Sequence, residues 1–178
     1  NGSNGKSTIL NVLKKFIGDE NLATVELDKL ATDRFMIAEL ENKIANIGDD
    51  IDAMDIINSG TIKKLCTGES MEVQRKYEHP FILKNYAKLI FSCNTLPRIA
   101  DKSEGMYSRM MFIPFNAVFT ADDPDFDPFV EDKVTTTEAM SYLLNRGLRG
   151  LRRLLFNNHF TNPKGVQGAQ DDYKINNS

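Results

Sequence analysis

The feature that most constrains the fold is the sequence "NGKST", with Gly5 as its glycine, which the apolar run "ILNVLKKFIG" follows. In the pattern G-x-x-x-x-G-K-[ST], a strand leads into a phosphate-binding loop and a helix follows. The apolar residues of the run have helical spacing and end at Gly18, which predicts that helix. The pattern's first glycine and its strand would lie before Asn1, so the chain is expected to be a fragment.

The residues of this loop are predicted to bind a nucleotide phosphate and its metal ion. In such a loop successive backbone N–H groups point at one anion, and the lysine, here Lys6, reaches the β and γ phosphates. The Ser7 hydroxyl would hold Mg²⁺. The predicted ATP-binding residues are therefore Asn4, Gly5, Lys6, Ser7 and Thr8. The alternative is a chance Gly-Lys-Ser-Thr before a helix.

Composition excludes several classes of protein. A chain of 178 residues with 41% hydrophobic and 26% charged residues suits one α/β domain and not a disordered, collagen-like or disulfide-rich chain. The net charge of −3 means that any DNA contact must be local. Cys66 and Cys93 lack metal-ligand spacing, and the apolar runs are strand-sized. A cytoplasmic location and no membrane partner are therefore expected.

Short apolar runs alternate with helical stretches along the chain. The strand-like runs are "NLATVEL", "KIANIGDDI", "YAKLIFSCN" and "RMMFIPF", and residues 28–42 and 55–67 have helical patterns. This alternation predicts a parallel-rich sheet with helices on its faces. Residues 71–84 are predicted to form a hairpin, residues 120–133 a surface loop, residues 135–158 a leucine-striped helix, and residues 161–178 a polar connection.

Polar residues follow or close these strands. Asp49 and Asp50 end "KIANIGDDI", where one acid could order the Mg²⁺ shell and the other polarise the attacking water. Asn94 closes "KLIFSCN", where an amide could contact both the γ-phosphate and the water. Arg109 comes just before "MMFIPF", where it could stabilise transition-state charge at a neighbouring subunit. Solvated turn acids, a turn-forming asparagine and a solvated arginine are the alternatives.

Taken together, five segments resemble the helicase domain of phage and plasmid primase-helicases, which is superfamily 3 of the AAA+ ATPases. They are "NGKST", "KIANIGDDI", "MEVQRKYEHPF", "KLIFSCNTLPRIADKSEGMYSRMMFIPF" and "LLNRGLRGLRRLL". The resemblance implies a P-loop AAA+ type three-layer α/β fold with a parallel-rich central sheet, an inserted β-hairpin and a C-terminal helical segment. Residues 1–120 would form the ATPase core, and residues 121–178 the C-terminal loop, helix and linker of the same domain.

The resemblance also assigns roles to the motif residues. Asp49 matches a metal-binding acid, Asp50 a catalytic acid, Asn94 the sensor asparagine, and Arg109 the arginine offered to the neighbouring subunit's ATP. The hairpin matches one that grips DNA in the central channel of a ring. Its expected DNA-binding residues are Arg75, Lys76, Tyr77 and Lys84.

The function implied is an ATP-driven helicase that assembles as a hexameric ring and moves 3′ to 5′ along single-stranded DNA. Its cofactors would be ATP and Mg²⁺, and its partners single-stranded DNA, further copies of itself and other replication proteins, in a bacterial host cytoplasm. Two alternatives stay open. One is a P-loop ATPase that does not unwind DNA, and the other is a truncated, inactive fragment that acts only as a DNA-binding or interaction module.

Overall fold

The computed structural model describes residues 4–51, 55–56, 58–124 and 126–177, and the side chains of residues 50, 55 and 56 are not among those described. Two compact units divide the chain. The described residues up to Phe16 and those of Phe112–Ala169 form the first unit, and Ile17–Met111 with the residues from Gln170 onward form the second. The sequence-based division at residue 120 stays a prediction.

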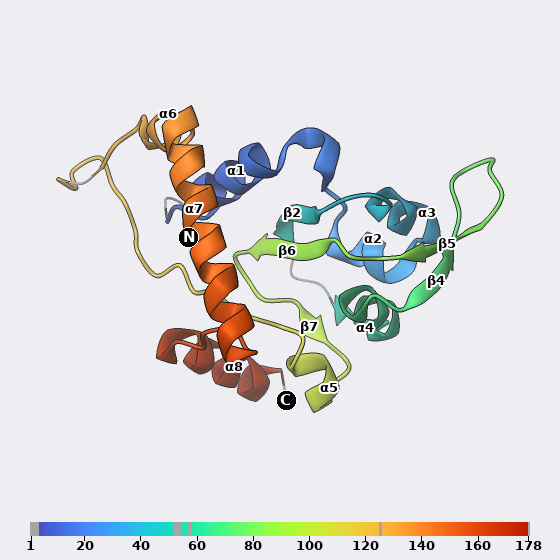
Figure 1. Ribbon diagram of the computed structural model, residues 1–178. Coiled ribbons are helices and arrows are strands. Elements are labelled where there is room, and N and C mark those ends of the chain that lie inside the picture. The colour runs from blue at the N-terminus through green and yellow to red at the C-terminus, as the bar shows by residue number, and fades with distance from the viewer. Residues whose placement is uncertain (1–3, 52–54, 57, 125, 178) are drawn as a thin grey trace. The chain divides into compact units, whose positions relative to one another are not determined.

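A three-stranded parallel sheet lies at the centre of the second unit. Its order is β1 (Leu22–Ala23), β2 (Ala45–Ile51) and β6 (Lys88–Cys93), as Figure 1 shows for β2 and β6. The residues Ala45 to Gly48 are buried because β2 has a neighbour on each side. The sequence prediction of a mixed α/β fold with parallel strands is thus confirmed.

Two close contacts fix the register of this sheet. Gly48 faces Phe91 across β2 and β6, and a Cβ atom on Gly48 would come within 2.7 Å of the Phe91 ring. Asn46 is fully buried, and its side-chain amide bonds both the backbone N–H of Val25 at 2.8 Å and the backbone carbonyl of Val25 at 2.9 Å. The Asn46 side chain therefore continues the pairing of β2 beyond the end of β1.

Helices cover the second unit's core. They are α2 (Leu27–Thr32), α3 (Arg34–Ile37), α4 (Ser59–Thr67) and α5 (Glu104–Tyr107), with single 3₁₀ turns at η1 (Asp19–Asn21) and η2 (Ala38–Leu40). Leu30, Leu40 and Leu65 are among the largest fully buried side chains. The helical stretch predicted from residues 28 to 42 is broken because the Asp33 side chain caps α3, accepting a bond from Phe35 N at 2.8 Å.

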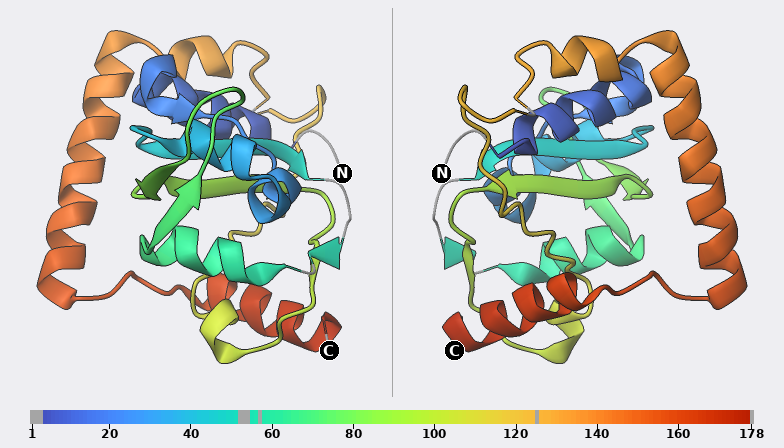
Figure 2. Two further views of the ribbon diagram at one scale, coloured as in Figure 1. Left: turned by 90° about the vertical axis from the view of Figure 1, so that its right-hand side faces the viewer. Right: turned by 90° about the vertical axis from the view of Figure 1, so that its left-hand side faces the viewer.

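An antiparallel hairpin is formed by β4 (Ser70–Val73) and β5 (Phe81–Lys84), and Figures 1 and 2 show its loop projecting beyond the paired strands. The predicted hairpin is therefore confirmed. A second parallel pair joins β3 (Asp55–Ile56) to β7 (Arg98–Ile99). The helix predicted to start at Asp55 is wrong at its start, because these residues pair with β7 and α4 begins only at Ser59.

The first unit contains most of α1 (Lys6–Ile17), with α6 (Val130–Val134) and α7 (Thr137–Asn157). The Asn11 side chain contacts Glu131 at 3.1 Å, and Lys15 Nζ lies 3.0 Å from the Thr135 hydroxyl, so α1 is tied to α6 and the turn after it. Thr136 caps α7 by accepting a bond from Ala139 N at 3.2 Å. The predicted helix that follows the loop and ends at Gly18 and the predicted helix at 135–158 are thus confirmed.

Two further sequence predictions are wrong. "RMMFIPF" forms no strand: Arg109 lies in the turn after α5, and the residues from Met110 to Phe115 belong to no helix or strand. The polar stretch from residue 161 is not a simple connection, because Lys164–Asn176 form the helix α8. Among the described residues, no helix is both long and apolar enough to cross a membrane.

Candidate functional site

The residues predicted to end a phosphate loop form a turn that leads into α1. Gly5 has a φ of 81°, in the left-handed region that favours glycine, and α1 begins at the next residue. The Gly5 carbonyl accepts a bond from Ile9 N at 3.1 Å, which closes the first turn of the helix. Lys6, Ser7 and Thr8 therefore occupy the first turn of α1, where backbone N–H groups lack helical partners and favour an anion.

Asn4 holds the start of this turn. Its side-chain oxygen accepts a bond from Lys6 N at 3.4 Å, and its amide nitrogen donates to the Phe115 carbonyl at 3.4 Å. The Lys6 side chain is half-buried and the Ser7 side chain is exposed. Of the predicted loop, the described residues begin at Asn4, and its role as a phosphate site stays a prediction.

Asp49 and Asn94 lie at the same edge of the parallel sheet. β2 ends at Ile51 and β6 at Cys93, and the carboxyl ends of parallel strands meet at one edge, where open α/β sheets bind ligands. The register of β2 and β6 is irregular between Gly48 and Ile51, which places the acidic pair at a local bulge. The Asp49 side chain is exposed there, and that of Asp50 lies outside the described residues.

Ser92 belongs to this edge, although the sequence did not single it out. Its buried hydroxyl donates to the Asp49 carboxylate at 2.8 Å and so orients that acid. The sequence did contain a signal for Ser92, because this serine lies near the end of an apolar strand and two residues before Asn94. Its partner, 43 residues away, was not apparent from the sequence.

Mg²⁺ prefers oxygen ligands, and the Ser7 hydroxyl and the Asp49 carboxylate are each of this type. Within the described residues, no group of three or more His, Cys, Asp and Glu side chains could hold a metal ion by itself. A nucleotide-bound Mg²⁺ takes most of its ligands from phosphate and water. Ser7 belongs to the first unit and Asp49 to the second.

Arg109 lies directly after α5 in the second unit. Its backbone N–H donates to the Met106 carbonyl at 3.1 Å, and its guanidinium donates to the Gly105 carbonyl. The side chain is exposed, and its positive charge acts on Cys66 of α4. Burial raises the pKa of the Cys66 thiol, and the charges of Arg109 and then Lys88 oppose that rise. The position of Arg109 is therefore set by α5.

The hairpin tip presents an aromatic side chain to solvent. Tyr77 is completely exposed and has a φ of 65°. The turn is closed by bonds from Gln74 Nε2 to the Glu78 carbonyl at 2.9 Å and from Glu78 N to the Arg75 carbonyl at 3.1 Å. Lys76 is exposed beside Tyr77, and the exposed Lys84 lies at the other end of the hairpin, opposite Ser70.

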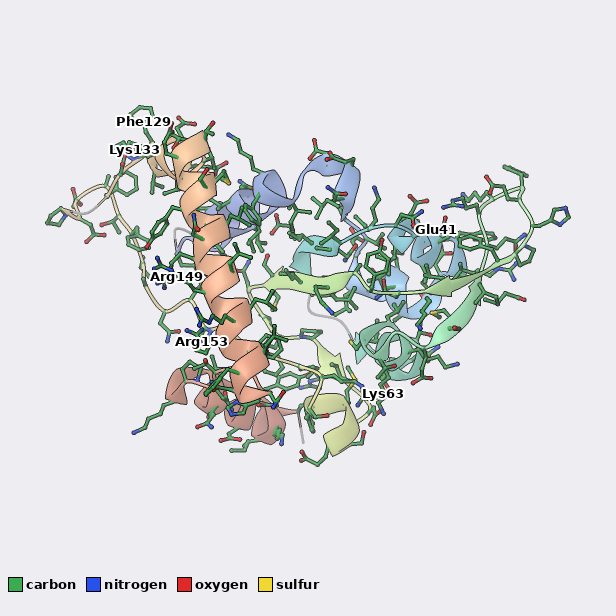
Figure 3. The ribbon with its side chains drawn as sticks, in the orientation of Figure 1. Glu41, Lys63, Phe129, Lys133, Arg149 and Arg153 are labelled. Atoms are coloured by element: carbon green, nitrogen blue, oxygen red, sulfur yellow. The ribbon has the colours of Figure 1, made fainter. Side chains whose placement is uncertain are left out.

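Arg75 has a different environment from its neighbour Lys76. Its guanidinium pairs with Glu41, lies 5.0 Å from the centre of the Phe81 ring, and approaches Glu78 at 3.9 Å. The hydrogen bond that Arg75 donates to the Glu41 carboxylate is the main cause that raises the pKa of Arg75. Figure 3 labels Glu41, which follows η2 on the side of the molecule from which the hairpin extends. Glu41 and Phe81 were not identified from the sequence, since their role depends on contacts across the fold.

Comparison with known proteins identifies a family and two named relatives. The profile of a family described as "Family of unknown function (DUF5906)" matches residues 1–109, more than half of the chain. "Putative helicase L207/L206" of Acanthamoeba polyphaga mimivirus is 29% identical over 124 residues, which is 66% of this chain and 13% of that protein. "Putative helicase 184R" of Invertebrate iridescent virus 6 is 30% identical over 86 residues, or 45% of this chain and 9% of that protein. The chain thus spans only a small part of the length of either relative.

Two solved structures share the fold. The A form apo structure of the NrS-1 C-terminal region matches with a TM-score of 0.58 and 22% identity, covering 79% of this chain and 32% of that one. A second apo structure of the NrS-1 C-terminal region, residues 305–718, matches with a TM-score of 0.51 and 16% identity, covering 80% of this chain and 34% of that one. At these identities the likeness concerns the fold alone.

Proposed function

The chain belongs to the family of unknown function DUF5906, and from that premise we propose that it is the ATP-hydrolysing domain of a superfamily 3 DNA helicase of the AAA+ class. The observation that carries the proposal is the turn at Gly5, which opens α1 in the form of a phosphate-binding loop. The sequence relatives named as putative viral helicases support the same class of activity.

In this proposal each side chain has one task at the nucleotide. Lys6 and the first N–H groups of α1 bind the phosphates. The Ser7 hydroxyl and the Asp49 carboxylate would hold Mg²⁺, which would supply positive charge against the phosphates. Ser92 orients Asp49 through its 2.8 Å hydrogen bond. Asp50 accepts the proton of the attacking water, and Asn94 orients that water against the γ-phosphate.

Arg109 acts on the ATP of a neighbouring copy, in the hexameric ring that such helicases form. Ring interfaces are head-to-tail, so that each site takes residues from two subunits. An arginine in this position neutralises charge that develops on the transferred phosphoryl group, which is worth roughly a thousandfold or more in turnover.

The hairpin is the proposed contact with single-stranded DNA. In this proposal Lys76 contacts a phosphate and Tyr77 stacks on a base, and the exposure of both side chains at the tip supports these roles. Lys84 is a further phosphate contact, at the base of the hairpin. Six copies of such a tip in one channel bind DNA locally, although the chain has a net charge of −3.

The test is steady-state ATP hydrolysis with and without single-stranded DNA, on this chain and on a version extended upstream by about thirty residues, enough for the strand and loop that complete the pattern. We expect DNA-stimulated turnover that Lys6→Ala removes. Lys29→Ala is the matched control, because Lys29 is an exposed lysine that contacts Asp28 on α2. Strand displacement on a forked substrate then separates the helicase from an ATPase that does not unwind DNA.

The other outcomes are equally definite. Turnover without strand displacement in an assembled ring would support the ATPase that does not unwind DNA. Absence of both turnover and nucleotide binding in either folded version would contradict the proposal. DNA binding that persists in that case would support the binding-module alternative.

A further inference from the structure

The end of α8 makes a buried polar contact with the segment that precedes Arg109. Tyr173 donates its hydroxyl to the Pro97 carbonyl at 2.7 Å. The Asn177 side chain accepts from Ile99 N at 3.1 Å and donates to the Ile99 carbonyl at 2.9 Å. One amide thus satisfies both backbone groups of a β7 residue, as a neighbouring strand would. Figures 1 and 2 show the C-terminal end of α8 beside α5 and β7.

The same helix end also holds α5 through Tyr107. Asn177 Nδ2 donates to the Tyr107 hydroxyl at 3.1 Å, and Gln170 Nε2 donates to the Tyr107 carbonyl at 2.9 Å. Lys174 lies 5.2 Å from the centre of the Tyr107 ring and pairs with Glu104 at 3.1 Å. The contact with α5 therefore involves both backbone and side chain.

The interior of this contact is excluded from water. Tyr107 is 4% exposed, Tyr173 5% and Asn177 7%, and the two tyrosine rings meet edge to face with centroids 6.1 Å apart. Burial is the main cause that raises the pKa of Tyr173 to about 12, so its hydroxyl keeps its proton over the physiological range. Buried polar groups that are fully hydrogen-bonded hold the contact in one geometry, because any other arrangement would leave a buried donor or acceptor without a hydrogen-bond partner.

Two hydrogen bonds connect Arg109 to α5, and a third connects the residue after it. Its N–H bonds the Met106 carbonyl, its guanidinium bonds the Gly105 carbonyl, and the next residue's N–H bonds the Tyr107 carbonyl at 3.1 Å. A displacement of α5 therefore moves the backbone and the side chain of Arg109 together. The contacts of Tyr107 with α8 oppose such a displacement.

We infer that Gln170, Tyr173, Lys174 and Asn177, here called the C-terminal clamp, are positioning residues that hold Arg109 in the orientation it needs at a neighbouring subunit's nucleotide. This inference rests on the proposed function. The inference adds a regulatory element to that function. Release of the last turns of α8 would free α5 and disable Arg109 without any change in the phosphate loop of the same subunit.

The first test measures hydrogen exchange in the chain and does not require ATP. The amides of Met106 to Met110 all donate to backbone carbonyls in or beside α5. In Asn177→Ala, and in the milder double variant Gln170→Ala with Tyr173→Phe, their exchange should accelerate by about tenfold or more, as expected for local opening. Amides of β2 should be unchanged. Asp172→Asn, an exposed change on the same helix, is the matched control and should have no effect.

If Asn177→Ala does not fold, the milder double variant decides the result. Its tyrosine ring stays in place, and only the hydroxyl and one side-chain amide are lost. Unchanged exchange at Met106 to Met110 in that folded variant would overturn the inference. Equal acceleration in β2 would also overturn it, because the clamp would then act on the whole unit.

The second test uses the preparation in which turnover has been established. The clamp variants should lower kcat by about tenfold with an unchanged KM for ATP, since they act through Arg109 and not through ATP binding. If Arg109→Ala abolishes turnover but the clamp variants change neither exchange nor kcat, the inference fails and the proposed function stands. If the clamp variants accelerate exchange while Arg109→Ala leaves turnover intact, the role proposed for Arg109 fails. The clamp is then a structural contact only.

Discussion

Arg75 and Lys76 are adjacent basic residues on one hairpin, but their surroundings predict different effects on DNA binding. Lys76 is exposed, so Lys76→Ala should lower the slope of log affinity against log salt by about 0.7, the value for one phosphate contact on a single strand. Arg75 is occupied by Glu41 and lies over Phe81, so Arg75→Ala should weaken binding by loosening the hairpin and leave that slope nearly unchanged.

The measurement is single-stranded DNA affinity over a range of salt concentrations. Glu41→Gln is the matched variant, because it removes the charge that holds Arg75 without touching the hairpin. It should reproduce the effect of Arg75→Ala. If Arg75→Ala lowers the salt slope and Glu41→Gln leaves DNA affinity unchanged, Arg75 binds phosphate directly.

Cys66 reports the position of Arg109 through its titration. Burial raises the pKa of the thiol, and the nearby guanidinium favours the thiolate and opposes this rise. Arg109→Met should therefore raise the pKa of Cys66 further and move the pH profile of alkylation toward higher pH. The profile is read on the Cys66 peptide by mass spectrometry, with Cys93 as internal reference. A profile that moves toward lower pH would contradict the proximity of the two side chains.

At the scale of single elements, Asn46 joins β2 to the residue where β1 has ended. Asn46→Leu keeps the volume but leaves the buried N–H and carbonyl of Val25 without these partners. Each unsatisfied buried group costs about 1–3 kcal/mol, so the free energy of unfolding should fall by about 3 kcal/mol. Urea unfolding measures this free energy. Asn116→Ala is the control, because Asn116 is exposed. If Asn46→Leu lowers the free energy of unfolding no more than the control does, the two bonds to Val25 do not stabilise the fold.

Asp101 links α4 to the start of α5 and makes their contact dependent on pH. Bonds from Lys63 first, then from Ser103 and Ser59, hold its pKa below the ordinary carboxyl range. Figure 3 labels Lys63 on α4. A lowered folded-state pKa stabilises the fold above the unfolded pKa of about 3.9, and this contribution is lost as the pH falls below it.

Asp101→Asn should therefore lower the urea midpoint at pH 6, and the difference from the unchanged chain should narrow as the pH falls toward 3. The neutral amide cannot gain or lose this charge over the range. The same measurement on the exposed Asp172→Asn should show no such narrowing. A difference that stays constant from pH 6 to pH 3 would mean that the Asp101 charge does not contribute to stability.

At the scale of the whole molecule, a shared nucleotide site predicts complementation between two inactive variants. Lys6→Ala lacks the phosphate contact, and Arg109→Ala lacks the group offered to the neighbour. If the two variants are mixed in equal amounts and assemble into common rings, roughly a quarter of the interfaces combine an intact Lys6 with an intact Arg109. Turnover should recover toward that fraction on mixing. Each variant alone should remain inactive, and absence of recovery in demonstrably mixed rings would contradict action between subunits.

The sequence by itself determined the elements whose signals are local. Apolar spacing and the glycines at either end predicted α1, Thr136 and the leucine spacing predicted α7, and alternating residues around a turn predicted the β4–β5 hairpin. The buried runs of β2 and β6 were likewise visible, and so was the presence of Asp49 and Asn94 at their ends. These signals need only the chain's own periodicity and turn chemistry.

Tertiary structure alone decided which residues meet. Ser92 reaches Asp49, Arg75 reaches Glu41, and Asn177 reaches Ile99 across 43, 34 and 78 residues respectively. The polar stretch from residue 161 also forms the helix α8, because Tyr173 on α8 and Asn177 just after it find buried partners. The predicted strand "RMMFIPF" has no ladder partner in the described chain, since apolar residues favour a strand only where another strand accepts their hydrogen bonds. Periodicity is a property of neighbours in sequence, whereas satisfaction of buried polar groups depends on neighbours in space.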